Sequence, residues 1–194
     1  MKVVINVILF LIACLLVYSL IGAIREPIAF RDQLQLREDA VDNQLKEIRK
    51  AQQIYRDVTG GSFASSWDSL KYVIQNGRIP IVSVFGDADD PNFDGEIRFD
   101  TSYVAAIDSA RSLGVDLDDI EGVPYSDGKT FDLFADTLTY QSVLTNVVEV
   151  GTPYKSFMGE YADQRFSKYD DAYDVDKVKK FGSRSSPSLS GNWE

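Results

Sequence analysis

One short segment has side chains suited to binding a metal ion. Asp90, Asn92 and Asp94, followed by Gly95, reproduce the opening of a D-x-N-x-D-G calcium loop. Their oxygen atoms are hard ligands of the kind calcium prefers, and the glycine permits the sharp turn that brings them together. Thr101 stands where such a loop places its closing bidentate glutamate. We interpret the segment either as a calcium site that stiffens a loop or, as we favour, as a solvated acidic turn.

Other side chains that commonly carry catalysis are scarce. The chain has no histidine, which excludes Ser-His and Cys-His pairs and imidazole metal ligands. Its single cysteine, Cys14, lies in an apolar N-terminal run, and the sequence has no phosphate-binding loop or dinucleotide fingerprint. Abundant carboxylates are what any acidic surface shows, and a Ser-Lys arrangement involving Lys129 stays open. We expect a protein that is not an enzyme and that has no cofactor apart from the candidate calcium ion.

The overall charge narrows the range of partners. The formal net charge is −10 and the isoelectric point is near 4.5. Binding to nucleic acid needs a basic face to contact phosphates, and the sequence concentrates none. Anionic headgroups should also repel the polar part of the chain. We therefore expect no nucleic acid partner.

The apolar run at the N-terminus must position everything that follows it. Residues 3–24 are apolar almost throughout, and as a helix rising ~1.5 Å per residue they would span the ~30 Å hydrocarbon layer of a membrane. A cleaved signal peptide is one alternative, and a lipobox at residues 11–14 is another. Because the sequence stays apolar beyond Cys14, we favour an uncut transmembrane anchor over residues 1–25.

A second helical segment is predicted over residues 26–59, directly after the anchor. Apolar side chains fall on one stripe of this amphipathic stalk. They are Leu34, Val41, Leu45, Ile48 and Tyr55. The stripe packs either on the protein's own sheet, which we favour, or against another copy or subunit. Asn6 and Gly22 are available for contacts between helices inside the bilayer.

The remaining pattern predicts a small α+β domain over residues 60–152. Glycines after residue 59 end the stalk, Ser65 and Ser66 can cap a short helix, and a strand follows over residues 79–85. We expect a helix over residues 102–113, a hairpin around Asp127 and Gly128, and strands over residues 138–140 and 143–150. These strands should form an antiparallel sheet. Residues 153–194 form an aromatic-rich extension with a Ser-rich tail that is either flexible or docked.

The first part of the chain resembles a known family, the type IV pilins and the pseudopilins of type II secretion systems. The resemblance covers residues 1–85, where an apolar helix runs through Pro27 into the phrase IRKAQQIYRDVTGGSFASSWDSL and then into a sheet domain. Ala51, Gln52 and Tyr55 match the family's A-Q-x-x-Y helix end. Ile5 and Asn6 stand near the position of the family's glutamate. The chain is also similar to uncharacterised bacterial single-pass membrane proteins.

This resemblance implies a pilin-like architecture, and the sequence as a whole leaves two candidate functions. The first is a structural or assembly subunit of a bacterial envelope complex or pilin-like filament. Its expected partners are the membrane and other copies or other envelope proteins. The chain would then be an oligomer or part of a larger complex. The second is a membrane-tethered binding module with an acidic, calcium-dependent surface. Positive charges flank both ends of the anchor, and their count alone would place the bulk in the cytoplasm. We nevertheless expect a single-pass protein of the bacterial inner membrane with an extracytoplasmic domain.

Overall fold

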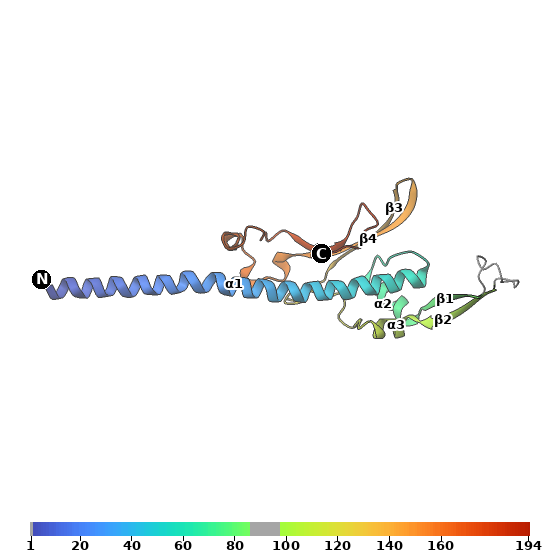
Figure 1. Cartoon of the computed structure of the whole chain (residues 1–194), viewed down its shortest axis with the longest axis horizontal. Coiled ribbons are helices and arrows are strands. Elements are labelled where there is room, and N and C mark those ends of the chain that lie inside the picture. Colours follow the sequence, from blue (N-terminus) through green and yellow to red (C-terminus); the bar gives the residue numbers. More distant parts are fainter. Residues whose placement is uncertain (1, 86–97) are drawn as a thin grey trace, which may run out of the picture.

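A computed structural model describes residues 2–85 and 98–194, and its main element is one very long helix. Helix α1 runs without interruption from Lys2 to Thr59 (Figure 1). The predicted anchor and stalk are therefore two parts of a single helix. Pro27 lies inside it. A proline removes one backbone hydrogen bond and often bends a helix, but the helix continues through this one to Phe30, where packing against the domain begins.

The two halves of α1 have different surroundings. Residues 4–26 are exposed on every side, whereas the half from Phe30 onward is packed inside the domain. By length and composition, α1 is the one helix among the described residues that could cross a membrane, although a signal sequence would satisfy the same criteria. The α+β layout expected from the sequence is confirmed: the long helix is followed by short helices and two small antiparallel sheets.

A buried amide fixes the end of α1 to the crossover that leads to the next helix. Gln52 is fully buried. Its side-chain Nε2 donates a hydrogen bond to the Ala64 carbonyl at 3.2 Å, and its Oε1 accepts one from the Ala64 N–H at 2.9 Å. Helix α2 then spans Trp67–Asn76, and the Ser66 hydroxyl oxygen accepts a hydrogen bond from Ser69 N–H as the predicted N-cap. Gln52, a polar side chain in the buried part of α1, thus satisfies the backbone at Ala64 in the crossover.

A two-stranded ribbon follows, formed by β1 (Arg78–Phe85) and β2 (Arg98–Ala105) in antiparallel register. The predicted strand over residues 79–85 is confirmed. The helix predicted over residues 102–113 is wrong in its first third, because β1 pairs with residues up to Ala105 and the helix, α3, covers only Ala106–Ser112. Strand pairing here overrides the local cap signal.

The second sheet has the order β3-β4-β5, with all strands antiparallel. Its strands are β3 (Asp132–Tyr140), β4 (Val143–Pro153) and β5 (Val178–Gly182). The predicted hairpin at Asp127 and Gly128 is a turn closed by a single bridge between Gly122 and Thr130. The true reversal lies at Gln141 and Ser142, which adopt φ of 48° and 68°.

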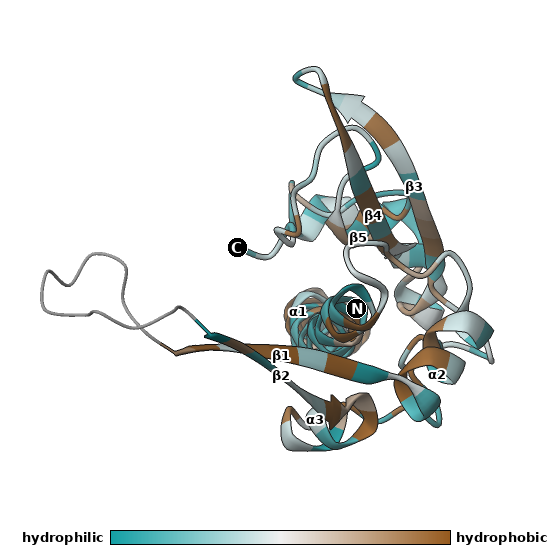
Figure 2. Ribbon diagram, turned by 90° about the vertical axis from the view of Figure 1, so that its right-hand side faces the viewer, coloured by the Kyte–Doolittle hydropathy of each residue, from teal (hydrophilic) through white to brown (hydrophobic). Residues whose placement is uncertain are grey.

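The two sheets lie on opposite sides of α1. Viewed along the helix in Figure 2, the β1–β2 ribbon and α3 lie on one side, and the three-stranded sheet lies on the other. Three short 3₁₀ segments connect β4 to β5: Tyr154–Ser156, Gly159–Tyr161 and Gln164–Tyr169. Their aromatic side chains belong to the same core as α1. The segment over residues 153–194 is therefore an integral part of the domain, and α1 is its central element.

Candidate interaction surface

The apolar stripe of the stalk lies inside the domain. Leu34, Val41, Leu45 and Ile48 are buried in the core, and the half-buried Tyr55 shares a 3.1 Å hydrogen bond between its hydroxyl and that of Ser69. The structure brings these residues together, but against the protein's own α2, α3 and strands. Packing within the chain is therefore the alternative that the geometry supports, and the stripe is not open to a partner.

The two candidates in the anchor lie on its exposed surface. Asn6 and Gly22 are both exposed, and a Cβ added to Gly22 would meet no atom within 4 Å. Sixteen residues of helix separate them, which is about 24 Å along the axis and about 160° around it. They therefore do not form one contact face, although a neighbouring helix could reach either of them.

The candidate calcium ligands Asp90, Asn92 and Asp94 lie outside the described residues. Within residues 2–85 and 98–194, no group of three histidine, cysteine, aspartate or glutamate side chains is arranged to hold a metal ion. Calcium binding therefore stays a prediction for the segment between β1 and β2.

The ribbon formed by β1 and β2 presents an unusual surface. Residues directly opposite each other in an antiparallel pair point to the same side of the sheet, and the register pairs Pro80 with Tyr103, Val82 with Thr101, and Val84 with Phe99. We call the outer part of this side the apolar face; its six members are Pro80, Val82, Val84, Phe99, Thr101 and Tyr103, and the pair Arg78 and Ala105 completes the same side at the base of the ribbon. All six are exposed. The exposed fractions reach 56% for Val82 and Val84, 63% for Tyr103 and 68% for Phe99.

The other side of the ribbon, the mixed face, combines apolar and charged residues. It carries Ile79, Ile81, Ser83 and Phe85 from β1, and Arg98, Asp100, Ser102 and Val104 from β2. Ile79 packs against the domain core, and the Ala106 N–H donates to the Gly77 carbonyl at 3.1 Å. These contacts fix the base of the ribbon. Figures 1 and 2 both show the ribbon projecting beyond the body of the domain, at the end away from the N-terminus.

A smaller apolar patch occupies the turn between β3 and β4. Val143 and Leu144 are exposed, and Tyr140 is partly so. This patch lies on the opposite side of α1 from the ribbon (Figure 2). Because it has three side chains and the ribbon has six on one face, the ribbon is the larger candidate.

A polar cluster along α1 fastens the helix to the C-terminal strands. Asp42 and Lys179 form an ion pair at 3.2 Å, with side chains 13% and 10% exposed, and the Tyr154 hydroxyl donates to Glu38. Burial raises the pKa of Asp42, with Lys179 opposing the shift, and burial together with the Glu38 hydrogen bond raises the pKa of Tyr154. The pair connects α1 to β5, and its closed surroundings suit a structural role.

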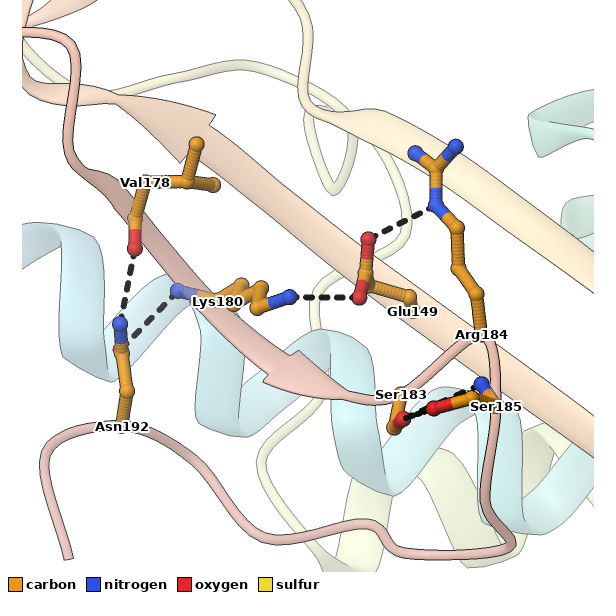
Figure 3. Close-up of polar contacts among 7 residues, drawn as sticks. All are labelled: Glu149, Val178, Lys180, Ser183, Arg184, Ser185 and Asn192. Atoms are coloured by element: carbon orange, nitrogen blue, oxygen red, sulfur yellow. Dashed lines mark hydrogen bonds and ion pairs between the residues drawn. The ribbon is translucent and has the colours of Figure 1, made fainter.

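The C-terminal tail is docked along the outer edge of β5. In Figure 3 the Asn192 side chain replaces a neighbouring strand: its Nδ2 donates to the Val178 carbonyl at 2.7 Å, and its Oδ1 accepts from the Lys180 N–H at 3.1 Å. Glu149 on β4 accepts from Lys180 at 2.6 Å and from Arg184 at 2.8 Å. Of the two alternatives for the tail, the docked one is confirmed.

The anchor-proximal end of the domain is closed by aromatic packing. The Phe30 ring contacts the rings of Tyr161, Phe166, Tyr169 and Tyr173, with centroid separations of 5.0 to 6.2 Å. Burial raises the pKa of Tyr173 to about 12, and its hydroxyl donates to the Tyr161 carbonyl. The aromatic residues of the extension therefore cover the core at this end of the domain.

Comparison with protein-family models, with curated proteins and with solved structures gives no match for this chain. The likeness to pilins stays a prediction, and the function is inferred from the arrangement of the residues. That arrangement singles out the apolar face, which the sequence pattern had not assigned. Alternation of Phe99, Thr101 and Tyr103 is a strand signal, but the predicted helix cap at Thr101 competed with it.

Proposed function

We propose that this chain is a non-enzymatic, single-pass membrane protein that acts as a structural or assembly subunit of a bacterial envelope complex. The observation that carries the proposal is the continuity of α1. Its exposed apolar half and the half that forms the centre of the domain belong to one helix, with no linker between them. The helix extends about 50 Å beyond the apolar run.

The continuity of α1 favours an assembly subunit over a binding module on a flexible tether. A flexible linker lets a tethered module explore the space around its anchor. A helix that is both anchor and core instead fixes the height and direction of the domain relative to the membrane. Surfaces at the far end, such as the ribbon, are then presented at a constant position, as a subunit of an ordered complex requires.

The direct experiment is purification of the full chain from bacterial membranes in a mild detergent. We expect the protein to resist extraction by alkaline carbonate and to run as an oligomer or with partners of fixed stoichiometry in size-exclusion chromatography with light scattering. Release by carbonate would contradict membrane spanning. A monomer without partners, in detergent and in intact membranes, would contradict the assembly role.

The proposed location is the inner membrane with the domain outside the cytoplasm. A protease added to spheroplasts should then digest the domain while leaving a cytoplasmic marker protein intact. Digestion only after lysis would reverse the orientation. A shortened N-terminus in the mature protein would show that the apolar run is a signal sequence.

A further inference from the structure

We propose that the apolar face of the β1–β2 ribbon binds the apolar face of a second copy of this chain, so that two ribbons pack face to face. This inference rests on the proposed function, because it names the surface through which one anchored subunit meets the next. The exposed fractions of the four largest side chains on this face carry the argument.

The apolar face has a large accessible area. With side chains 56% to 68% exposed at Val82, Val84, Phe99 and Tyr103, the face presents roughly 500 Å² of accessible surface, which is at the upper end for a patch on a monomer. Complete burial of two such faces would remove at most about 1,000 Å² from solvent in total, which is the lower limit for a specific interface. Anchoring in one membrane raises the effective concentration of the copies, which suits an interface of this size.

The charge on the ribbon bears on two-fold symmetry. In a two-fold symmetric interface the same patch occurs on both partners, so a charge near the axis meets its own copy. On the side that carries the apolar face the one charged residue is Arg78, which is exposed at the base of the ribbon; from Pro80 to Val84 on β1 and from Phe99 to Tyr103 on β2 this side has none. The mixed face has Arg98 and Asp100 in its outer half. The apolar face is therefore the side of the ribbon compatible with self-association.

The outer part of the ribbon is accessible to a second copy. The base of the ribbon is held by Ile79 and by the hydrogen bond from Ala106 to Gly77, while the rest projects clear of the domain (Figures 1 and 2). Two copies in one membrane have their ribbons at the same height. A two-fold axis parallel to α1 can therefore relate the two apolar faces and leave both anchors in the membrane.

The effect of salt on binding distinguishes a second copy of this chain from a basic partner protein. The chain has a formal net charge of −10 at pH 7. Two copies therefore repel each other, and added salt should screen this repulsion and strengthen the pairing. A basic partner protein would instead bind less tightly as salt is added.

The test is cross-linking of the full chain in proteoliposomes, with Cys14 replaced by serine. Facing sheets lie about 10 Å apart, which is too far for a disulfide, so a short bismaleimide is the reagent. Val82→Cys on the apolar face is compared with Ser83→Cys, the neighbouring exposed position on the mixed face. We expect about fivefold more cross-linked dimer from Val82→Cys and a higher yield at higher salt.

A second substitution shows whether the face itself is responsible. Adding Val84→Glu or Thr101→Glu to Val82→Cys should reduce the dimer to the yield of Ser83→Cys, because each places like charges inside the interface. Both side chains are exposed, and an unchanged thermal melt confirms that the domain stays folded.

Three results would overturn the inference: equal yields from the two cysteine positions, a yield unaffected by either glutamate, or a cross-link only to a different protein. If the chain is oligomeric by light scattering while any of these holds, the ribbon assignment fails and the proposed function stands. If the chain is monomeric and without partners in membranes, both fail.

Discussion

Replacement of Leu45 tests whether the stripe on α1 is a core or an assembly surface. The Leu45 side chain is fully buried where α1 passes through the domain core. Leu45→Ala removes most of a buried side chain, and the surrounding elements can close the space only partly, so we expect a loss of about 3 kcal/mol in the free energy of unfolding. For a domain of this size the loss corresponds to a melting temperature lower by about 6 to 12 °C.

The assay is denaturant and thermal unfolding of the full chain in mild detergent, followed by circular dichroism and by the fluorescence of Trp67 and Trp193, which pack against the core. Leu36→Ala is the matched control, because Leu36 lies on the same helix and is 50% exposed; its effect should stay within about 0.5 kcal/mol. A Leu45→Ala protein as stable as wild type would refute the reasoning. So would a folded Leu45→Glu protein that had lost only its ability to assemble.

Three further predictions concern buried polar groups. Gln52→Leu should lower the free energy of unfolding by about 2 kcal/mol, because the N–H and carbonyl of Ala64 lose their partners. Lys179→Met should lower the free energy of unfolding by about 3 kcal/mol at neutral pH, because the charged Asp42 would then be buried and unpaired. Burial already raises the pKa of Asp42, and loss of the lysine raises it further. The penalty should therefore shrink in mild acid, where the Asp42 carboxyl becomes neutral. Glu149→Gln should cost about 1 kcal/mol at neutral pH. Burial alone would raise the pKa of Glu149, but its two basic partners lower it below the ordinary 4.5, so its stabilisation is present above that pH and lost as the pH falls through the lowered value.

Each of these has a control and a contradicting outcome. Gln53→Leu, at the neighbouring half-buried position, should change stability little. Combining Lys179→Met with Asp42→Asn should recover most of the lost stability, because no charge is then buried alone. An equal loss from Lys179→Met in acid and at neutral pH would exclude burial of a charged Asp42 as the cause. A pH profile of Glu149→Gln parallel to wild type would exclude the Glu149 contribution.

Local signals predicted several elements well. The Ser66 cap, the helix it starts and the strand over residues 79–85 follow from neighbouring residues alone, and the structure confirms them. The helix predicted to start at residue 102 was wrong in its first part, because residues 102–105 pair as a strand with β1, which lies more than twenty residues earlier in the chain. The turn at Asp127 and Gly128 formed, but strand pairing was decided elsewhere, since a turn motif does not contain the residues that pair.

The candidate interaction surface likewise depends partly on local sequence signals and partly on which distant segments pair. Periodicity identified Leu34, Val41, Leu45 and Ile48 as one stripe, but it could not say which element the stripe would meet. The structure supplies the protein's own strands and helices. Conversely, the apolar face becomes visible only when Val82 and Val84 are set beside Phe99 and Tyr103, because register joins residues that are distant in the chain.

The sequence by itself determined that an apolar helix begins the chain, that an amphipathic helix follows and that the remainder is a small acidic α+β domain, because charge, hydropathy period and caps are local properties. Only the tertiary structure decided that the stripe packs on the protein's own helices and strands, that the extension and tail complete the core, and that the ribbon remains uncovered. Burial depends on which distant segments meet, and an apolar residue has the same side chain whether it is covered or left exposed.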